Sequence, residues 1–569
     1  MDVSCQYSYT RGDGMDGSIN IFNTISETIK RHSKNPQKVA HVYVDWQTGE
    51  RKVVTFKGIY DRATEIGYGL LEMDIEKGDI VALGTENIPE WMYATIGIQM
   101  CGAIPLHFVF NRKDGKDVED VLKIAGTACK AIIFPPGKDD VNLSVVEKIC
   151  KPGFQKGNVV SETIESIKWA ALMSMYKSND VYPCMSDIIK KGHSTERCFP
   201  RTDPDDVMGL LMTSGSSGVP KLVPVSHRNM LTNGYHLQYC YGLSSEISLN
   251  DRPFCWNLGY PSWEIFTGST RVIVQGVTEI QSMPEYFEVV KKIIKSEKCN
   301  AALLITPILH EFLSKSPNDI HLDTVFTGGQ SVPAKFADLT KSICNRFVNG
   351  YGCTEIGGLA LKEVYRSTEY LDSEVGVPFE GVEIKVVDAE ENLVKCGDEG
   401  QLMVRSPNQF LGYWNNAEKT DEVYSKSRWY KTGDLSQLTT NGSLIVTGRI
   451  SDSMIKIGPR FVSTTTLETK LNNHPAIEDA IVIPLVDEMR DHSVCCAIVA
   501  RKGKTLTKEM IDDYLLDLEN RTEQNFLQTV ELPKNYVFLD TFPCTARGKF
   551  DRKKIMEICK NELGMDKSD

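Results

Sequence analysis

The strongest constraint on the fold is the regular alternation of short apolar runs with amphipathic segments along the first part of the chain. This order is typical of α/β layers built on a largely parallel sheet. The predicted strands are Val39–Asp45, Lys52–Thr55, Ile80–Gly84, Ala103–Phe110, Val207–Met212, Val272–Val274 and Leu303–Ile305. The predicted helices are Asn20–Lys34, Phe56–Met73, Ile88–Met100, Met283–Ser296 and Leu309–Ser314, with a further helix after His227. The first helix has Ser18 or Asn20 as its expected N-cap. Lys123–Ile133 repeats the pattern, and Lys151–Thr202 is interpreted as a long irregular connection.

The pattern of predicted strands and helices changes twice towards the C-terminus. From about Val375 short strands and turns dominate, and after Gly448-Arg449 helices and strands mix again. Strands and helices of these parts are predicted at Val382–Val387, Gly400–Arg405, Gly442–Val446, Leu467–Leu471, Ile477–Pro484, Lys508–Asn520 and Tyr536–Leu539. A chain of 569 residues is also too long for one core. We therefore expect an N-terminal domain at 1–447 with a β-rich subdomain at about 375–447, a hinge at 448–452 and a C-terminal domain at 453–569.

Composition excludes several functional classes. Asp and Glu number 76 against 64 Lys and Arg, so the chain lacks the basic footprint of a nucleic-acid-binding protein. The 16 cysteines include no C-x-x-C pair, which disfavours zinc sites and a secreted disulfide scaffold. The N-terminal residues lack an apolar signal region, and the apolar stretch Trp91–Phe110 is broken by glycine, proline and histidine, as in a buried helix followed by a buried strand. A cytoplasmic protein without a transmembrane segment is expected.

The segment that ends in His227 has the composition of a phosphate-binding loop. Its sequence, LMTSGSSGVPKLVPVSH, gathers hydroxylated residues and glycines whose backbone N–H groups can turn towards one anion. Gly215 and Gly218 permit positive φ, and Lys221 adds a positive charge. The lysine follows Val-Pro and no hydroxyl residue comes after it, so the segment is not a Walker P-loop. Taken alone, the loop fits phosphate binding and a flexible surface turn equally well.

Four later segments have chemistry suited to a nucleotide. Asn349–Glu355, NGYGCTE, offers an aromatic face for a purine and a carboxylate suited to Mg²⁺. Tyr430–Leu435, YKTGDL, places an aspartate after a Thr-Gly turn, where it can accept hydrogen bonds from ribose hydroxyls. Gly448–Arg460, GRISDSMIKIGPR, has arginines on either side of a bend, and Pro543–Arg552, PCTARGKFDR, presents a lysine on a glycine-containing loop. Each segment alone is better explained by an ordinary structural role.

Together and in this order, the segments resemble the adenylate-forming superfamily of acyl-CoA synthetases, peptide-synthetase adenylation domains and firefly-type luciferases. The family pattern T-S-G-[ST]-[ST]-G-x-P-K is met by Thr213–Lys221, Y-G-x-T-E by Tyr351–Glu355 and T-G-D by Thr432–Asp434. The hinge pattern is met by Gly448–Arg460 and the pattern P-x-T-x-x-G-K by Pro543–Lys549. The resemblance covers nearly the whole chain.

The resemblance implies an α/β fold: a large N-terminal domain of parallel and mixed sheets with helices and a small β-rich subdomain, and a small mobile α+β lid. It also implies a two-step ligase. A carboxylate attacks the α-phosphate of ATP to give acyl-AMP and pyrophosphate, and a thiol, usually that of coenzyme A, then attacks the acyl carbon and releases AMP. ATP, Mg²⁺ and coenzyme A are therefore expected, with a small-molecule carboxylic acid as the remaining substrate.

Residue roles follow by the same resemblance. The implied catalytic residues are Lys549, Glu355, Thr213 and Lys221, and Glu355 is the implied Mg²⁺ ligand. The hinge falls at Ser451 or at Asp452. Binding of ATP is assigned to Thr213, Ser214, Gly215, Ser216, Ser217, Gly218, Lys221, Gly350, Tyr351, Gly352, Cys353, Thr354, Glu355, Asp434, Arg449, Arg460 and Lys549.

The segment Asn257–Phe266, NLGYPSWEIF, bears on the acid. Members that activate amino acids place an aspartate a few residues before W-E, where this chain has Gly259, so an α-amino acid is disfavoured. The expected pocket lining favours an apolar carboxylate, fatty or aryl; Trp263 fits a place in the core equally well. This lining comprises Trp256, Tyr260, Trp263, Gly328, Gly329 and Gln330.

Two other functional classes stay open. One is an adenylating enzyme that passes its acyl group to a carrier protein or to oxygen, as luciferases do. Gly458-Pro459 departs from the usual residues of a loop that supports thiolation in other members, and this keeps the first class open. The other is a catalytically retired nucleotide-binding protein. The intact Lys221, Glu355 and Lys549 argue against the second class.

Overall fold

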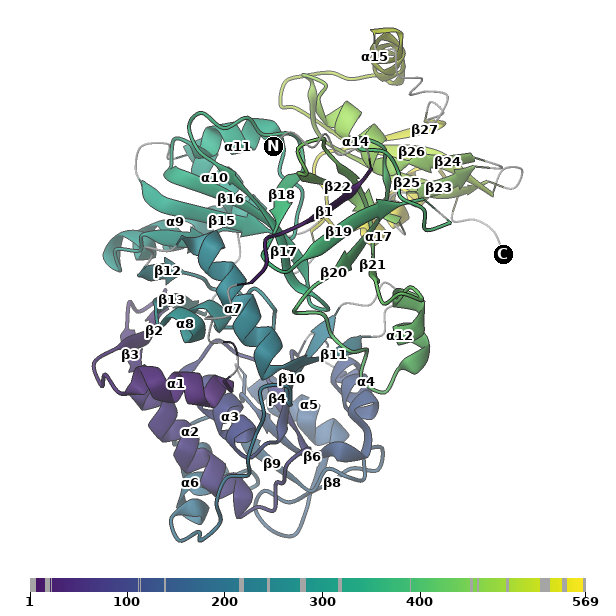
Figure 1. Cartoon of the computed structure of the whole chain (residues 1–569). Coiled ribbons are helices and arrows are strands. Elements are labelled where there is room, and N and C mark those ends of the chain that lie inside the picture. Colours follow the sequence, from purple (N-terminus) through teal and green to yellow (C-terminus); the bar gives the residue numbers. More distant parts are fainter. Residues whose placement is uncertain are drawn as a thin grey trace.

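The computed structural model describes residues 7–15, 21, 23–110, 112, 114–137, 140–213, 220–242, 246–276, 283–315, 320–388, 390–450, 454–457, 460–487, 491–521, 533–544 and 550–565. These residues form two large sheets, with helices packed on them, and a smaller sheet near the C-terminus (Figure 1).

A six-stranded sheet lies in the purple and blue part of the molecule at the bottom of Figure 1. Its strands are β4 (Ile80–Gly84), β5 (Ile104–Phe108), β6 (Cys129–Phe134), β9 (Trp169–Leu172), β10 (Val207–Thr213) and β11 (Lys221–Ser226). Their order is β11-β10-β5-β4-β6-β9, in which β11 is an antiparallel edge strand and the others are parallel. The helices of this part are α2 (Phe56–Leu71), α3 (Pro89–Met100), α4 (Lys116–Ala125), α5 (Val141–Ile149) and α6 (Met185–Gly192). Its small elements are η1 (Gly126–Ala128), β7 (Lys151–Pro152) and β8 (Val159–Val160).

The second sheet has 14 strands. They are β1 (Tyr9–Arg11), β2 (Val39–Asp45), β3 (Arg51–Thr55), β12 (Ile247–Leu249), β13 (Thr270–Gln275), β14 (Ala301–Leu303), β15 (Leu322–Gly328), β16 (Cys344–Cys353), β17 (Gly357–Val364), β18 (Glu374–Pro378), β19 (Glu383–Val387), β20 (Gly400–Arg405), β21 (Tyr430–Leu438) and β22 (Leu444–Arg449). The run β2-β13-β12-β14-β15-β16 is parallel, and the remaining neighbours are antiparallel. β18 joins the β-rich part to β17, so both parts belong to one mixed sheet. The associated helices are α1 (Ile25–Ser33), α7 (His227–Tyr241), α8 (Ser262–Thr267), α9 (Met283–Ser296), α10 (Thr306–Lys315), α11 (Ala334–Thr340) and α12 (Ala417–Val423).

The C-terminal part, yellow-green at the upper right of Figure 1, has its own sheet and cores. Its elements are β23 (Met454–Ile457), β24 (Arg460–Ser463), α14 (Thr464–Asn472), β25 (Ile477–Asp487), β26 (Asp491–Ala500), α15 (Lys508–Arg521), β27 (Asn535–Leu539) and α17 (Arg552–Glu562). Alternate residues of β25 face opposite sides of this sheet: Val482 joins the core with α14 and α15, whereas Ile483 joins the core with α17.

The structure confirms the α/β fold class and corrects several elements. The predicted bounds of β2, β4, β20 and α9 agree with the structure. Helix α1 does not start at Ser18 or Asn20; Thr24 caps it in a capping box with Glu27. Residues 151–202 are not an irregular connection, because they contain β9, which extends the parallel sheet, and α6. Strands β11 and β26 were not predicted.

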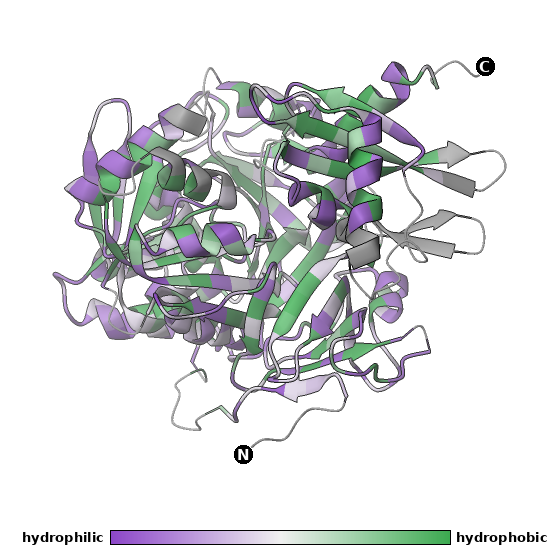
Figure 2. Ribbon diagram, turned by 90° about the horizontal axis from the view of Figure 1, so that it is seen from above, coloured by the Kyte–Doolittle hydropathy of each residue, from purple (hydrophilic) through white to green (hydrophobic). Residues whose placement is uncertain are grey.

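The cores lie between the sheets and their helices, where Figure 2 shows strands coloured mainly as hydrophobic. Every residue of α3 except one and every residue of β5 is buried, as expected for a buried helix followed by a buried strand. Among the described helices, none is both long enough and apolar enough to cross a membrane.

Candidate functional site

The β10–β11 hairpin holds the two ends of the predicted phosphate loop. The strands pair antiparallel with Thr213 directly opposite Lys221, and both residues are half-buried. Because these two strands are paired at this point, the positions at which the loop begins and ends are fixed. The loop residues Ser214, Gly215, Ser216, Ser217 and Gly218 lie outside the described residues.

The end of β16 and the turn that follows it carry the Y-G-x-T-E segment. This position is the carboxyl end of a parallel strand, where ligands of α/β sheets commonly bind. A Cβ atom at Gly352 would lie 2.3 Å from the carbonyl oxygen of Gly357, so only glycine allows β16 and β17 to meet here. Gly328 of β15 pairs with Gly350, which brings Gly329 and Gln330 to the same edge of the sheet. Of the predicted residues, Gly350, Tyr351, Gly352 and Cys353 end β16, and Thr354 and Glu355 lie in the turn.

Asp434 connects the turn of β16 to the β21–β22 pair. Its side chain is 7% exposed, accepts a hydrogen bond from the Tyr351 hydroxyl and lies 2.7 Å from Arg449 Nε. Asp434 and Arg449 are direct partners in the antiparallel register. Burial raises the pKa of Tyr351, and the nearby Asp434 carboxylate raises it further, so the phenol stays protonated and donates its hydrogen bond. The sequence pattern named these three residues without indicating that they touch.

Tyr413 connects Glu355 to Lys221, and it was not predicted. Its hydroxyl donates a buried 2.8 Å hydrogen bond to Glu355 Oε1, and Lys221 Nζ lies 4.7 Å from the centroid of its ring. The backbone N–H of Trp414 also donates to the carbonyl of Leu222 in β11 at 2.9 Å. The segment around Tyr413 therefore attaches the edge of the six-stranded sheet to the end of β16. The adjacent aromatic residues after Gly412 were the one available signal in the sequence.

Cys353, the last residue of β16, is close enough to both carboxylates to be affected by their charges. Burial raises the pKa of its thiol, and the charges of Glu355 and Asp434 raise it further. The thiol therefore stays protonated and has no nucleophilic character. The two acidic groups, together with Lys221 and Arg449, form one cluster of opposite charges at the junction of the two sheets. Such a cluster can hold a polyanion on its cations and the hydroxyls or metal ion of that ligand on its carboxylates.

Three further predicted residues lie outside the described residues, namely Lys549, Ser451 and Asp452. Arg460 is the first residue of β24, and no position of its side chain is described.

A small cavity lies next to the turn of β16. Its volume is about 10 Å³, which is room for about one water molecule. Thr354 and Gly357 border it from the turn, Met230 and Asn233 from α7, and Asn257 from the loop at residues 250–260, hereafter the 250–260 loop. The cavity is therefore closed to any carboxylic acid in this conformation.

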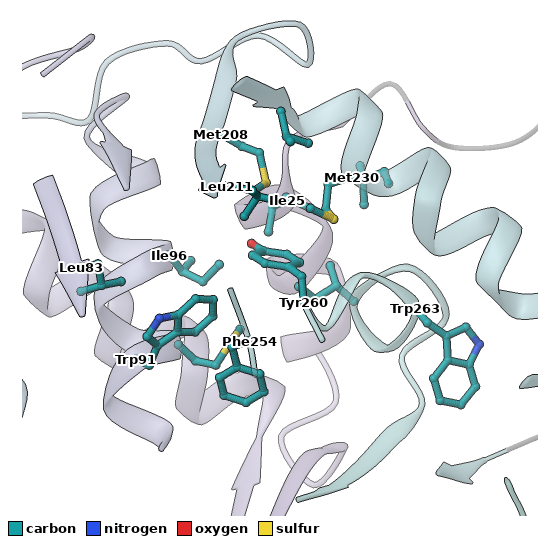
Figure 3. Packing of buried hydrophobic residues seen from close by; sticks show 14 of the residues in the cluster. Ile25, Leu83, Trp91, Ile96, Met208, Leu211, Met230, Phe254, Tyr260 and Trp263 are labelled. Carbon is teal, nitrogen blue, oxygen red and sulfur yellow. The ribbon is translucent and has the colours of Figure 1, made fainter. Parts of the chain in front are cut away.

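The 250–260 loop is tightly folded. A Cβ atom at Gly259 would lie 1.9 Å from the carbonyl oxygen of Pro253, so no side chain fits there without movement of the loop. Tyr260 and Trp263 are each 1% exposed. In Figure 3 the Tyr260 ring points into the core beside Trp91, whereas Trp263 lies on the other side, where it stacks on Tyr241. The cavity is not bordered by Tyr260 or Trp263, because both rings pack against core side chains; their role in acid binding stays a prediction.

Trp256, on the same loop, is half-buried. Its backbone carbonyl accepts hydrogen bonds from the N–H groups of Gly259 and Tyr260 at 2.9 and 2.7 Å. Its predicted place in the acid pocket stays a prediction.

Glu355 fits the chemistry of a Mg²⁺ ligand. Mg²⁺ in nucleotide sites is held by one or two carboxylates together with phosphate oxygens, and Glu355 is a carboxylate with a hydrogen-bonded, nearly buried side chain. No cluster of three or more His, Cys, Asp or Glu side chains suited to a metal occurs in the described parts of the chain. This donor set suits a metal ion that arrives with the nucleotide's phosphates.

Comparisons with known proteins agree with this geometry. The AMP-binding enzyme family matches residues 29–414, and the AMP-binding enzyme C-terminal domain matches residues 466–549. A mitochondrial medium-chain acyl-CoA ligase, ACSF2 of Danio rerio, is 26% identical over 95% of this chain and 88% of its own length. A long-chain-fatty-acid–CoA ligase of Escherichia coli O157:H7 is 25% identical over 90% of this chain and 91% of its own.

Solved structures show the same fold. The anthranilate CoA ligase AuaEII, in complex with anthranoyl-AMP, superposes with a TM-score of 0.76 at 20% identity and covers 97% of this chain and 100% of its own. ATP-bound MatB from Rhodopseudomonas palustris superposes with a TM-score of 0.75 at 17% identity. The superposition covers 95% of this chain and 99% of MatB. The chain therefore belongs to the AMP-binding, adenylate-forming enzyme family.

Proposed function

We propose that this chain is an acid–thiol ligase that activates an apolar carboxylate, fatty or aryl, as acyl-AMP and transfers the acyl group to coenzyme A. The observation that supports it most is the cluster of Lys221, Tyr413, Glu355, Asp434 and Arg449 at the junction of the two sheets. It combines cations for phosphate with carboxylates for a metal ion and for hydroxyl groups.

In the first step, a carboxylate oxygen attacks the α-phosphorus of ATP, an O–P bond forms, and pyrophosphate leaves. This chemistry needs positioning and charge stabilisation rather than a protein nucleophile. Thr213 and Lys221, at the base of the hairpin loop, hold the leaving pyrophosphate. Glu355 holds Mg²⁺, which offsets phosphate charge. Lys549 enters the site and bridges the carboxylate and the α-phosphate, where its charge reduces the repulsion between the two anions.

The nucleoside lies along the end of β16. Tyr351 supports the adenine, and Asp434, held by Tyr351 and Arg449, accepts hydrogen bonds from the ribose hydroxyls. In the second step, the sulfur of coenzyme A attacks the acyl carbon, the acyl C–O bond breaks, and AMP leaves with the former carboxylate oxygen. The lid at 453–569 turns about the hinge at 448–452 between the two steps and withdraws Lys549.

The substrate class rests on two supports. The Danio rerio and Escherichia coli relatives are named for medium-chain and long-chain acyl substrates, and AuaEII is named for anthranilate. The tight turn at Gly259 also leaves no space for the aspartate that amino-acid-activating members carry there. Because the cavity holds about one water molecule, an acid enters it only when α7 and the 250–260 loop move apart. The cytoplasmic location stays a prediction, and the Danio rerio relative is named as mitochondrial.

The test is carboxylate-dependent ATP–pyrophosphate exchange across fatty, aryl and amino acids, followed by AMP release with and without coenzyme A. Exchange with fatty or aryl acids, lost in Lys549→Ala, supports adenylation, and AMP release that needs coenzyme A supports the thiol step. Exchange without coenzyme A-dependent release favours a carrier protein or oxygen as acceptor. ATP binding without exchange for any acid would show a retired enzyme and refute the proposal.

A further inference from the structure

Arg271 is a fully buried arginine directed at the 250–260 loop. It lies in β13, is 0% exposed and stacks its guanidinium 4.9 Å from the Phe254 ring centroid. Its nitrogens donate to three backbone carbonyls of the loop: Nε to Asn250 at 2.6 Å, Nη2 to Arg252 at 3.0 Å, and Nη1 to Gly259. These carbonyls come from both ends of the loop, so the one planar guanidinium group of Arg271 holds the two ends of the loop together.

The charge of Arg271 is balanced by a buried carboxylate. Glu264 of α8 is 2% exposed, and its Oε1 lies 3.9 Å from Arg271 Nε without a hydrogen-bond partner. A buried charge without a partner is costly, so the pair is retained as a unit. Burial lowers the pKa of Arg271 and the Glu264 charge raises it, and the guanidinium remains charged because its ordinary pKa is far above neutrality.

A second residue holds the same loop independently. Asn87 donates to the carbonyls of Asp251 and Arg252 at 3.1 and 3.0 Å and accepts the Phe254 N–H at 3.0 Å. Five backbone groups of the loop, four carbonyls and one N–H, are therefore tied to side chains of two other segments. Asn257, at its middle, borders the cavity next to Thr354, and half-buried Trp256 precedes it.

We propose that Arg271 is a positioning residue for acid binding: its guanidinium holds the 250–260 loop at the cavity and thereby determines which acids are accepted. The proposal rests on the function proposed above, in which this loop borders the acid. Arg271 itself contacts neither the acid nor ATP. Its effect reaches the acid through the positions of Trp256 and Asn257, and loosening the loop changes how far it can separate from α7.

The test compares Arg271→Lys with wild type in acid-dependent ATP–pyrophosphate exchange. Lysine keeps the charge opposite Glu264 but offers no planar fork for three carbonyls. We expect the KM for the acid to rise about tenfold or more and the ranking of acids to change, since a 1 Å displacement in positioning can cost on the order of 10²-fold. The KM for ATP should stay within about twofold, because the nucleotide contacts lie on other strands.

Two further variants separate positioning from stability. Arg197→Lys is the matched control: Arg197 also donates to a backbone carbonyl, that of Leu71, and pairs with Asp74, but it contacts neither the 250–260 loop nor α7. It should lower the melting temperature and leave the acid KM unchanged. Asn87→Ala loosens the same loop without burying a lone charge, and it should shift the acid KM and ranking in the same direction as Arg271→Lys.

The outcomes are distinct. If wild type exchanges but Arg271→Lys and Asn87→Ala keep its acid KM and ranking, the inference is wrong and the proposed function stands. If Arg271→Lys does not fold, Asn87→Ala alone decides in the same way. If wild type shows no exchange with any acid, the proposed function and this inference both fail.

Discussion

Replacement of Tyr413 by phenylalanine removes one hydroxyl and keeps the ring under Lys221. The lost interaction is a buried 2.8 Å hydrogen bond to the Glu355 carboxylate. Hydrogen bonds to charged groups contribute about 1.5–3 kcal/mol net. Because Glu355 is nearly buried, it has little access to water to replace the lost donor. If this bond orients Glu355 for the metal ion, the change corresponds to a loss of roughly 10- to 100-fold in binding of the Mg²⁺–ATP complex.

Tyr413→Leu also removes the ring 4.7 Å from Lys221 Nζ. A cation–π contact contributes about 0.5–2 kcal/mol, depending on how far water is excluded. We therefore expect the KM for Mg²⁺–ATP to rise in the order wild type, Tyr413→Phe, Tyr413→Leu. The KM for the acid should change less in both variants, since Tyr413 does not border the cavity.

The assay is the initial rate of ATP–pyrophosphate exchange at varied Mg²⁺–ATP and at varied free Mg²⁺. Tyr424→Phe is the matched control, because this neighbouring buried tyrosine donates its hydroxyl to the Phe410 carbonyl instead of to Glu355. The reasoning is refuted if Tyr413→Phe has the Mg²⁺–ATP dependence of Tyr424→Phe, or if excess Mg²⁺ restores no part of its activity.

Asp434→Asn should weaken ATP binding about tenfold or more, since it removes a charged acceptor for hydrogen bonds; calorimetry with ATP measures this, and unchanged affinity contradicts it. Burial lowers the pKa of His41 to about 3 and those of His227 and His236 to about 4. Their folded pKa values lie below the unfolded value of about 6.5, so the stability they contribute is present above pH 6.5 and is lost as pH falls towards 4. Urea unfolding at pH 7.5 and 5 should show this loss. Burial raises the pKa of Asp479 to about 6, so Asp479→Asn should raise the free energy of unfolding at pH 8, with a gain that shrinks below pH 6.

The periodicity of apolar residues predicted those strands and helices whose structure is decided by residues close to them in the sequence. The apolar runs of β2 and β4 and the amphipathic helix α9 have the predicted bounds because each buries one continuous set of apolar residues. Strand β11 was missed because Pro224 interrupts its apolar run, and proline disfavours a central strand. The structure shows why Pro224 is tolerated. Because β11 is an edge strand, the missing backbone N–H does not remove a hydrogen bond to a second neighbouring strand.

The site shows the same division. The motifs identified Lys221, Glu355 and Asp434, and the structure brings them together from the start of β11, the turn after β16 and the interior of β21. The contact between Tyr413 and Glu355 spans 58 residues, and no local pattern encodes it. Arg271 was missed for a similar reason, since its three partners are backbone carbonyls, which have no sequence signature.

The most direct test of the central claim is the fate of the carboxylate oxygens. A fatty or aryl acid labelled with oxygen-18 in its carboxylate is incubated with the enzyme, ATP and coenzyme A, and the AMP produced is analysed by mass spectrometry. Attack of the carboxylate on the α-phosphorus, followed by cleavage of the acyl C–O bond, leaves one labelled oxygen on each AMP. We expect that label in AMP and the other in acyl-CoA. Unlabelled AMP, or labelled orthophosphate together with ADP, would contradict the acyl-AMP mechanism.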